Sequence, residues 1–111
     1  MMDGHVTIAL AGQPATLAPT LGAAIELSRR HENFGALLAK IEALDFLASV
    51  DVVRIGLGRP EREHEATAQE VFESGLLDLM PSIARFVFLL ANGGRPPKEE
   101  DTAEAGTPFG A

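Results

Sequence analysis

The stretch "SIARFVFLLA", residues 82–91, decides the predicted fold because it is apolar on almost every side. Its apolar side chains recur at the spacing of a helix, which predicts a helix over about 82–91. The inward stripe of this helix consists of Ile83, Phe86, Val87 and Leu90. A helix that is apolar nearly all round lies either at the centre of a core or beneath a partner protein.

Two apolar side chains of this helix, Phe88 and Leu89, fall outside the inward stripe. Burial in the core is our first interpretation of this surplus. A contiguous exposed apolar patch marks a protein-binding surface. The alternative hypothesis is therefore a partner-binding site that comprises Phe86, Phe88 and Leu89.

Two helices are predicted upstream, each with a polar residue that caps its first turn. Thr20 is expected to cap a helix that ends near "HEN" at 31–33, and Asn33 is expected to cap the next one. The apolar stripe expected for the first helix contains Leu21, Ala24, Ile25 and Ser28. The stripe expected for the second contains Phe34, Leu37, Leu38, Ile41 and Leu44.

Two more helices are predicted between these and the central stretch. The third covers about 46–57 and ends at Gly58, with a charged loop at 59–66 after it. Its inward face is expected to contain Phe46, Val50, Val53 and Leu57. "TAQE" at 67–70 resembles a capping box that starts the fourth helix. The inward side of that helix is expected to contain Phe72, Gly75, Leu76 and Leu79, and Pro81 is expected to start the fifth helix.

The first residues predict a β-hairpin. Apolar and small side chains alternate through 5–11, Gly12 and Pro14 indicate a turn, and 15–18 can return as the partner strand. An isolated hairpin is marginal in water, so it must pack on the helices. The predicted fold class is α+β and mainly α: one domain over 1–94, with a short N-terminal hairpin packed on about five helices. The segment 95–111, rich in proline and acidic residues, is predicted to be a disordered acidic tail.

Composition excludes several classes of partner and site. The chain has 111 residues and a net charge of −7 without a basic cluster, which argues against nucleic acid and anionic membranes. The absence of cysteine excludes disulfides and thiolate sites and fits a cytoplasmic location. The longest strongly apolar stretch, 86–91, is too short to span a bilayer.

No motif indicates catalysis, a cofactor or a metal. His31 and His64 both precede a glutamate, but neither has the second histidine at i+4 that a zinc-protease helix needs. "GLGRPE" at 56–61 lacks the third glycine and the lysine of a phosphate-binding loop. The glutamates at 61, 63 and 65 lie in a hydrophilic loop without an apolar pocket to shift their pKa values. We therefore expect a protein that is not an enzyme and that has no cofactor or metal.

The ordered part of the sequence resembles a family of small tail-assembly proteins of gene transfer agents and long-tailed phages. The resemblance covers roughly residues 4–93 and lies in Gly12 to Leu17, "TLGAAIEL" at 20–27, "FGALLAKI" at 34–41 and "DVVRIGLG" at 51–58. After Gly58 the chain departs from the family pattern, because "RPEREHEATAQE" replaces the usual end of small residues and glycine. Members of the family are named either tail tube proteins or tail assembly chaperones.

The resemblance implies a tail assembly chaperone, which coats the tape measure protein until tube subunits polymerise around it. The partners would be the tape measure protein and possible tube subunits, and self-association stays open. The first alternative is a structural component of the tail itself, although one short hairpin fits a β-rich tube subunit poorly. The second alternative is a small regulatory protein-binding domain unrelated to tails.

Overall fold

In the computed structural model, which describes residues 4–96, an N-terminal hairpin packs on five α-helices and confirms the predicted fold class. The elements are β1 (Val6–Leu10), β2 (Gln13–Leu17), α1 (Leu21–Arg30), α2 (Phe34–Glu42), α3 (Phe46–Gly56), the short 3-10 helix η1 (Glu61–Glu63), α4 (His64–Ser74) and α5 (Leu76–Ala91). The tail predicted at 95–111 lies outside the described residues, apart from Arg95 and Pro96.

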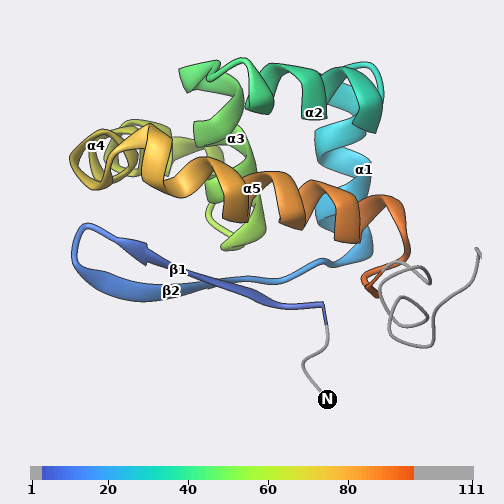
Figure 1. Cartoon of the computed structure of the whole chain (residues 1–111), viewed down its shortest axis with the longest axis horizontal. Coiled ribbons are helices and arrows are strands. Elements are labelled where there is room, and N and C mark those ends of the chain that lie inside the picture. The colour runs from blue at the N-terminus through green and yellow to red at the C-terminus, as the bar shows by residue number, and fades with distance from the viewer. Residues whose placement is uncertain (1–3, 97–111) are drawn as a thin grey trace, which may run out of the picture.

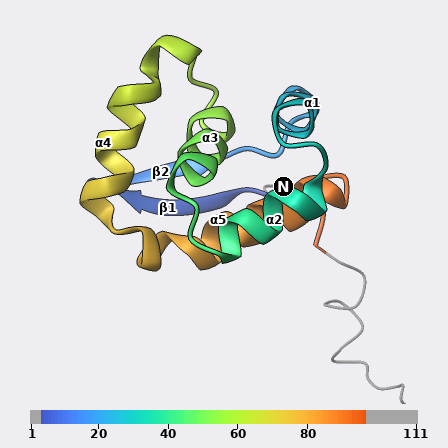
Figure 2. The same cartoon turned by 90° about the horizontal axis from the view of Figure 1, so that it is seen from above.

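Helix α5 is the central element of the molecule. Figure 1 shows it running along the long axis, with the hairpin below it, α2 above it and α3 behind it. Figure 2, the view from above, shows α4 at one end of α5 and α1 beside its other end. Its buried residues are Leu79, Ile83, Ala84, Phe86, Val87, Leu89 and Leu90. Most apolar side chains of α5 are therefore buried because the hairpin, α2 and α3 pack on different sides of this helix.

The hairpin is antiparallel, with Val6 opposite Leu17 and Leu10 opposite Gln13. Its first strand confirms the predicted alternation, since Val6, Ile8 and Leu10 are buried and the residues between them are exposed. The connecting residues Ala11 and Gly12 have φ angles of 52° and 81°, as a tight two-residue turn with positive φ requires. The second strand begins at Gln13 and includes Pro14, which a two-stranded sheet tolerates because both strands are edges.

The predicted N-caps are confirmed. The Thr20 hydroxyl accepts a hydrogen bond from the Ala23 amide at 3.1 Å, and the Asn33 side chain accepts one from the Ala36 amide at 2.7 Å. Asp45, which the sequence analysis did not single out, caps α3 in the same way through the Ala48 amide. The predicted end of α3 is also confirmed, since Gly58 follows it with a φ of +77°.

The predicted inward face of α1 is wrong. Leu21 and Ile25 are 77% and 46% exposed, and the buried residues of this helix are Ala23 and Leu27. The apolar residues between 21 and 27 occupy more than one side of the helix, so the sequence supports two different stripes. The packing of α1 on α3 selects the stripe of Ala23 and Leu27.

The predicted boundaries of the last two helices are also wrong. The break falls at Gly75, whose φ of 95° ends α4, whereas Pro81 lies inside α5. Helix α4 starts at His64, so Thr67 is not a cap; its buried hydroxyl donates to the Glu63 carbonyl one turn earlier. Phe72 and Leu44 were expected to face inward, but both are exposed, and Leu44 follows the end of α2 with a φ of 64°.

Candidate functional site

The three predicted partner-binding residues do not share a surface. Phe86 and Leu89 are 0% and 1% exposed, because α5 turns them into the core, whereas Phe88 is 51% exposed. A binding surface of all three side chains is thus excluded in the folded chain. The exposed side of α5 is a stripe of Leu77, Pro81, Arg85 and Phe88, which we call the α5 stripe.

His31 and Asp51 form the most enzyme-like pair in the described residues. His31 Nε2 lies 3.0 Å from Asp51 Oδ2, and Lys40 Nζ lies 3.4 Å from His31 Nδ1. Both ring nitrogens thus face residues with ionisable side chains, and within residues 4–96 no hydroxyl group contacts the His31 ring. The pair connects the end of α1 to α2 and α3, which is a structural role.

A second polar cluster surrounds Arg54, which is 1% exposed. Its Nη1 donates to the Arg59 carbonyl at 2.9 Å, and its Nη2 lies 3.5 Å from Glu26 Oε2 and 3.9 Å from Glu61 Oε1. Arg30 also contacts both glutamates. Burial lowers the pKa of Arg30, but the hydrogen bond and charge of Glu61, together with the charges of Asp51 and Glu26, outweigh it, so that the pKa is raised.

This cluster lies between α1, α3 and η1 and holds the charged loop in place. Arg59 extends it to α4, since its Nη1 donates to Glu70 Oε1 at 2.6 Å and to the Thr67 hydroxyl at 3.0 Å. The guanidinium groups and carboxylates neutralise one another. Glu26 and Arg30 also line a hollow beside α1, together with Gly22, Ile25 and Arg29. We interpret the cluster as a structural network.

Arg54→Met is expected to change the free energy of unfolding by less than about 1.5 kcal/mol. Methionine keeps the apolar part of the side chain in place. A buried guanidinium group with incomplete hydrogen bonds contributes little more to stability than an apolar side chain of similar length. Atoms Nε and Nη2 of Arg54 have no hydrogen-bond partner among residues 4–96. Urea denaturation of the variant measures this change; a loss above about 3 kcal/mol would show that the charge itself holds the network together.

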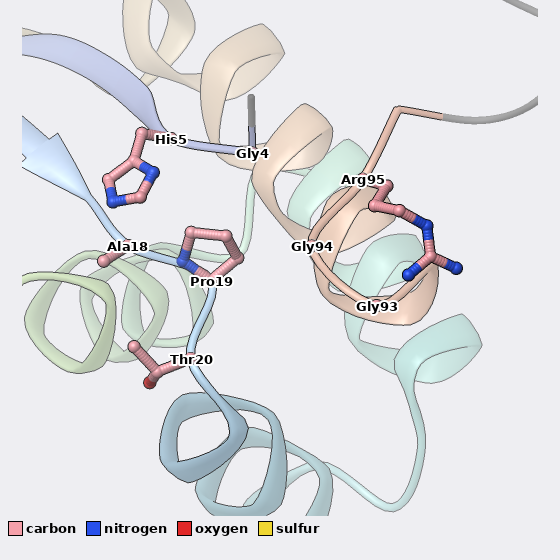
Figure 3. A pocket seen from close by; sticks show the side chains of 8 residues that line it. All are labelled: Gly4, His5, Ala18, Pro19, Thr20, Gly93, Gly94 and Arg95. Atoms are coloured by element: carbon pink, nitrogen blue, oxygen red, sulfur yellow. The ribbon is translucent and has the colours of Figure 1, made fainter. Parts of the chain in front are cut away.

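Open hollows in the described residues lie at the N-terminal start of α1 and along its exposed side. One of about 350 Å³ lies between Gly4–His5, Ala18–Thr20 and Gly93–Arg95. Figure 3 shows that backbone and small side chains form most of its walls, and that His5 and Arg95 stand on opposite sides. Residues 4–96 contain no group of three or more His, Asp or Glu that could hold a metal ion. This hollow therefore presents no converging set of catalytic groups.

Comparisons with protein-family models, with curated proteins and with solved structures give no match. Within the described residues, no single helix has the length and apolar composition to cross a membrane. The segments Glu61–Ser74 and Leu76–Ala91 meet both requirements only when they are taken together, and they are bent by 117° relative to each other.

The surface features that remain are exposed apolar side chains. The large ones are Leu21, Ile25, Leu44, Leu47, Phe72, Leu77 and Phe88. They lie on four different parts of the surface: α1, the α2–α3 connection, the α4–α5 corner and the α5 stripe. Sequence reasoning found only Phe88, because it did not single out Leu47 or Leu77. It interpreted four others as core residues: Leu21, Ile25, Leu44 and Phe72.

Proposed function

We propose that this chain is a protein-binding assembly factor of the tail assembly chaperone type. Its partner in this proposal is the tape measure protein of a gene transfer agent or a long-tailed phage. The observation that carries the proposal is the set of large apolar side chains on the surface, such as Leu21, Phe72 and Leu77, in a chain with net charge −7. The sequence resemblance in "TLGAAIEL" and "FGALLAKI" supplies the class of partner.

The physical role in this proposal is to shield apolar helices until assembly. Single exposed apolar residues are normal on proteins, but several of them offer separate contacts to a long helical partner. Small contacts of modest affinity allow tube subunits to displace the chaperone later. The acidic surface keeps such complexes apart in a crowded cytoplasm, where we place this activity.

Co-expression with the tape measure protein of the same gene cluster tests the proposal. The intact chain is expected to increase the soluble fraction of the tape measure protein and to co-purify with it. A soluble fraction that is the same with and without the chain contradicts the proposal. The chaperone is also expected to be absent from finished particles; stoichiometric copies, found by mass spectrometry, would indicate a structural tail subunit instead.

Phe88→Asp is expected to weaken this binding at least about tenfold without unfolding the chain. A carboxylate on the α5 stripe would have to lose its water against an apolar partner, and each tenfold loss corresponds to about 1.4 kcal/mol. Circular dichroism checks the fold, and co-purification measures the binding. Leu89→Asp is the control, because it places a charge in the core and is expected to unfold the domain. Unchanged binding by the Phe88 variant would exclude the α5 stripe as the surface.

A further inference from the structure

The solvent-facing side of α1 carries Leu21, Ile25 and Arg29 on three successive turns. Together with Gly22, these residues form what we call the α1 face. We propose that the α1 face binds an amphipathic helix of a partner protein that carries carboxylates next to its apolar stripe. This inference rests on the proposed function for its biological partner, but it concerns a surface separate from the α5 stripe.

The shape of the α1 face suits a second helix. Leu21 and Ile25 project from α1 and lie outside the core cluster, to which α1 contributes the buried residues Ala23 and Leu27. A hollow of about 460 Å³ lies beside them, lined by Gly22, Ile25, Glu26, Arg29 and Arg30. A second hollow of about 280 Å³ lies between α1 and the end of α5. Projecting apolar side chains beside hollows are the surface that ridges-into-grooves packing requires.

Gly22 is a second observation that favours the docking of another helix on the α1 face. A Cβ atom added there would meet only the Thr20 hydroxyl oxygen, 4.0 Å away, so the fold leaves open space for a side chain. Gly22 also has no positive φ that would require glycine. Glycine within a helix lowers stability relative to alanine. The missing side chain allows another backbone to approach α1 closely.

The charge of the α1 face identifies the chemistry of its partner. Glu26 and Arg30 are held in ion pairs with each other and with Arg54 and Glu61, whereas Arg29 takes part in no ion pair among the described residues. The face is therefore apolar and cationic in a chain of net charge −7. A cation in the last turn of a helix also interacts favourably with the helix dipole. That effect explains the presence of Arg29, but it does not explain the exposed Leu21 and Ile25 on the same side. A partner carboxylate about one helical turn, or ~5.4 Å, from its apolar contact would pair with Arg29.

A second copy of the chain fits this surface poorly. An antiparallel pair of α1 helices centred on Ile25 would place each Arg29 beside the positive N-terminal end of the other helix. A parallel pair would place the two Arg29 side chains side by side. Both arrangements bring like charges together, so the charges favour an acidic partner.

The test uses the full chain and two synthetic amphipathic helical peptides as probes. One peptide carries leucines at i and i+4 with glutamates one turn away, and the other replaces those glutamates with lysines. In NMR titrations, the glutamate peptide is expected to shift the signals of Leu21, Ile25 and Arg29 and to bind at least about tenfold more tightly than the lysine peptide. Leu21→Asp is expected to abolish this binding, and Arg29→Glu is expected to reverse the preference. Leu47→Asp, at an exposed leucine outside the face, is the control and is expected to bind normally.

Several results would overturn the inference. These are equal affinity for both peptides, shifts confined to Phe72, Leu77 or Phe88, or a dimer in sedimentation that Leu21→Asp dissociates. The inference would also be overturned if residues 97–111 of the same chain bind the α1 face. A comparison of the NMR signal of Leu21 in the full chain and in a chain truncated after residue 96 detects this binding. If the glutamate peptide binds the α1 face but the tape measure protein stays insoluble, the proposed function fails and the inference stands. If the unchanged chain solubilises the tape measure protein but binds both peptides with equal affinity, the inference fails and the proposed function stands.

Discussion

Phe86→Ala is expected to lower the free energy of unfolding by about 3–5 kcal/mol. The Phe86 side chain is fully buried in α5, and its ring reaches the point where α3 meets the hairpin, near Gly56. Alanine removes the whole ring and leaves a cavity whose walls belong to three different elements, so the site cannot collapse easily. A loss of this size is a large part of the total stability of a small domain.

Phe88→Ala provides the matched control, since it removes the same ring two residues further along the same helix. Phe88 is half exposed, so the control is expected to cost less than about 1 kcal/mol. Urea denaturation followed by circular dichroism measures both variants. Similar losses for the two variants would show that α5 does not have the orientation described, and that the assignment of Phe88 to the surface is wrong.

The sequence predicted the elements of this fold well where a local signal exists. The hairpin follows from alternating residues and a turn at Gly12, and the caps at Thr20 and Asn33 follow from side chains that bond their own first turns. These features depend on neighbours within a few residues. Each could therefore be derived from the order of residues alone.

The sequence predicted the faces of the helices less well, because faces depend on partners far along the chain. Leu21 and Ile25 have helical spacing, yet the residues that α1 buries against its neighbouring helices are Ala23 and Leu27. Likewise, Pro81 indicates a helix start in isolation, but Gly75 breaks the chain first and Pro81 is held inside α5. The predicted binding set of Phe86, Phe88 and Leu89 could not be divided from the sequence for the same reason, since only the packed structure shows that Phe88 is exposed and that Phe86 and Leu89 are buried. The polar network of Arg54 had no sequence signal, because its members come from three separate segments.

Gly56→Leu is expected to lower the free energy of unfolding by about 3 kcal/mol, at the upper end of typical overpacking effects. A Cβ atom at Gly56 would lie 3.1 Å from Leu17 Cδ2 and 3.1 Å from Phe86 Cε2, both on fully buried side chains. The backbone is held too, because the Ala18 amide donates to the Gly56 carbonyl at 2.9 Å. A leucine there must push the hairpin away from α3 and α5.

Gly58→Ala separates this packing effect from backbone strain. Gly58 has a φ of +77° and open space around it, so alanine is expected to cost about 1 kcal/mol through strain alone. Thermal unfolding gives the two losses, and the NMR signals of the Leu17 methyl groups are expected to move in the Gly56 variant only. Equal losses without a shift at Leu17 would mean that the hairpin does not rest on Gly56. A difference between the two variants would instead show that two glycines in one short motif act differently: Gly58 permits the turn, and Gly56 permits the close contact between sheet and helices.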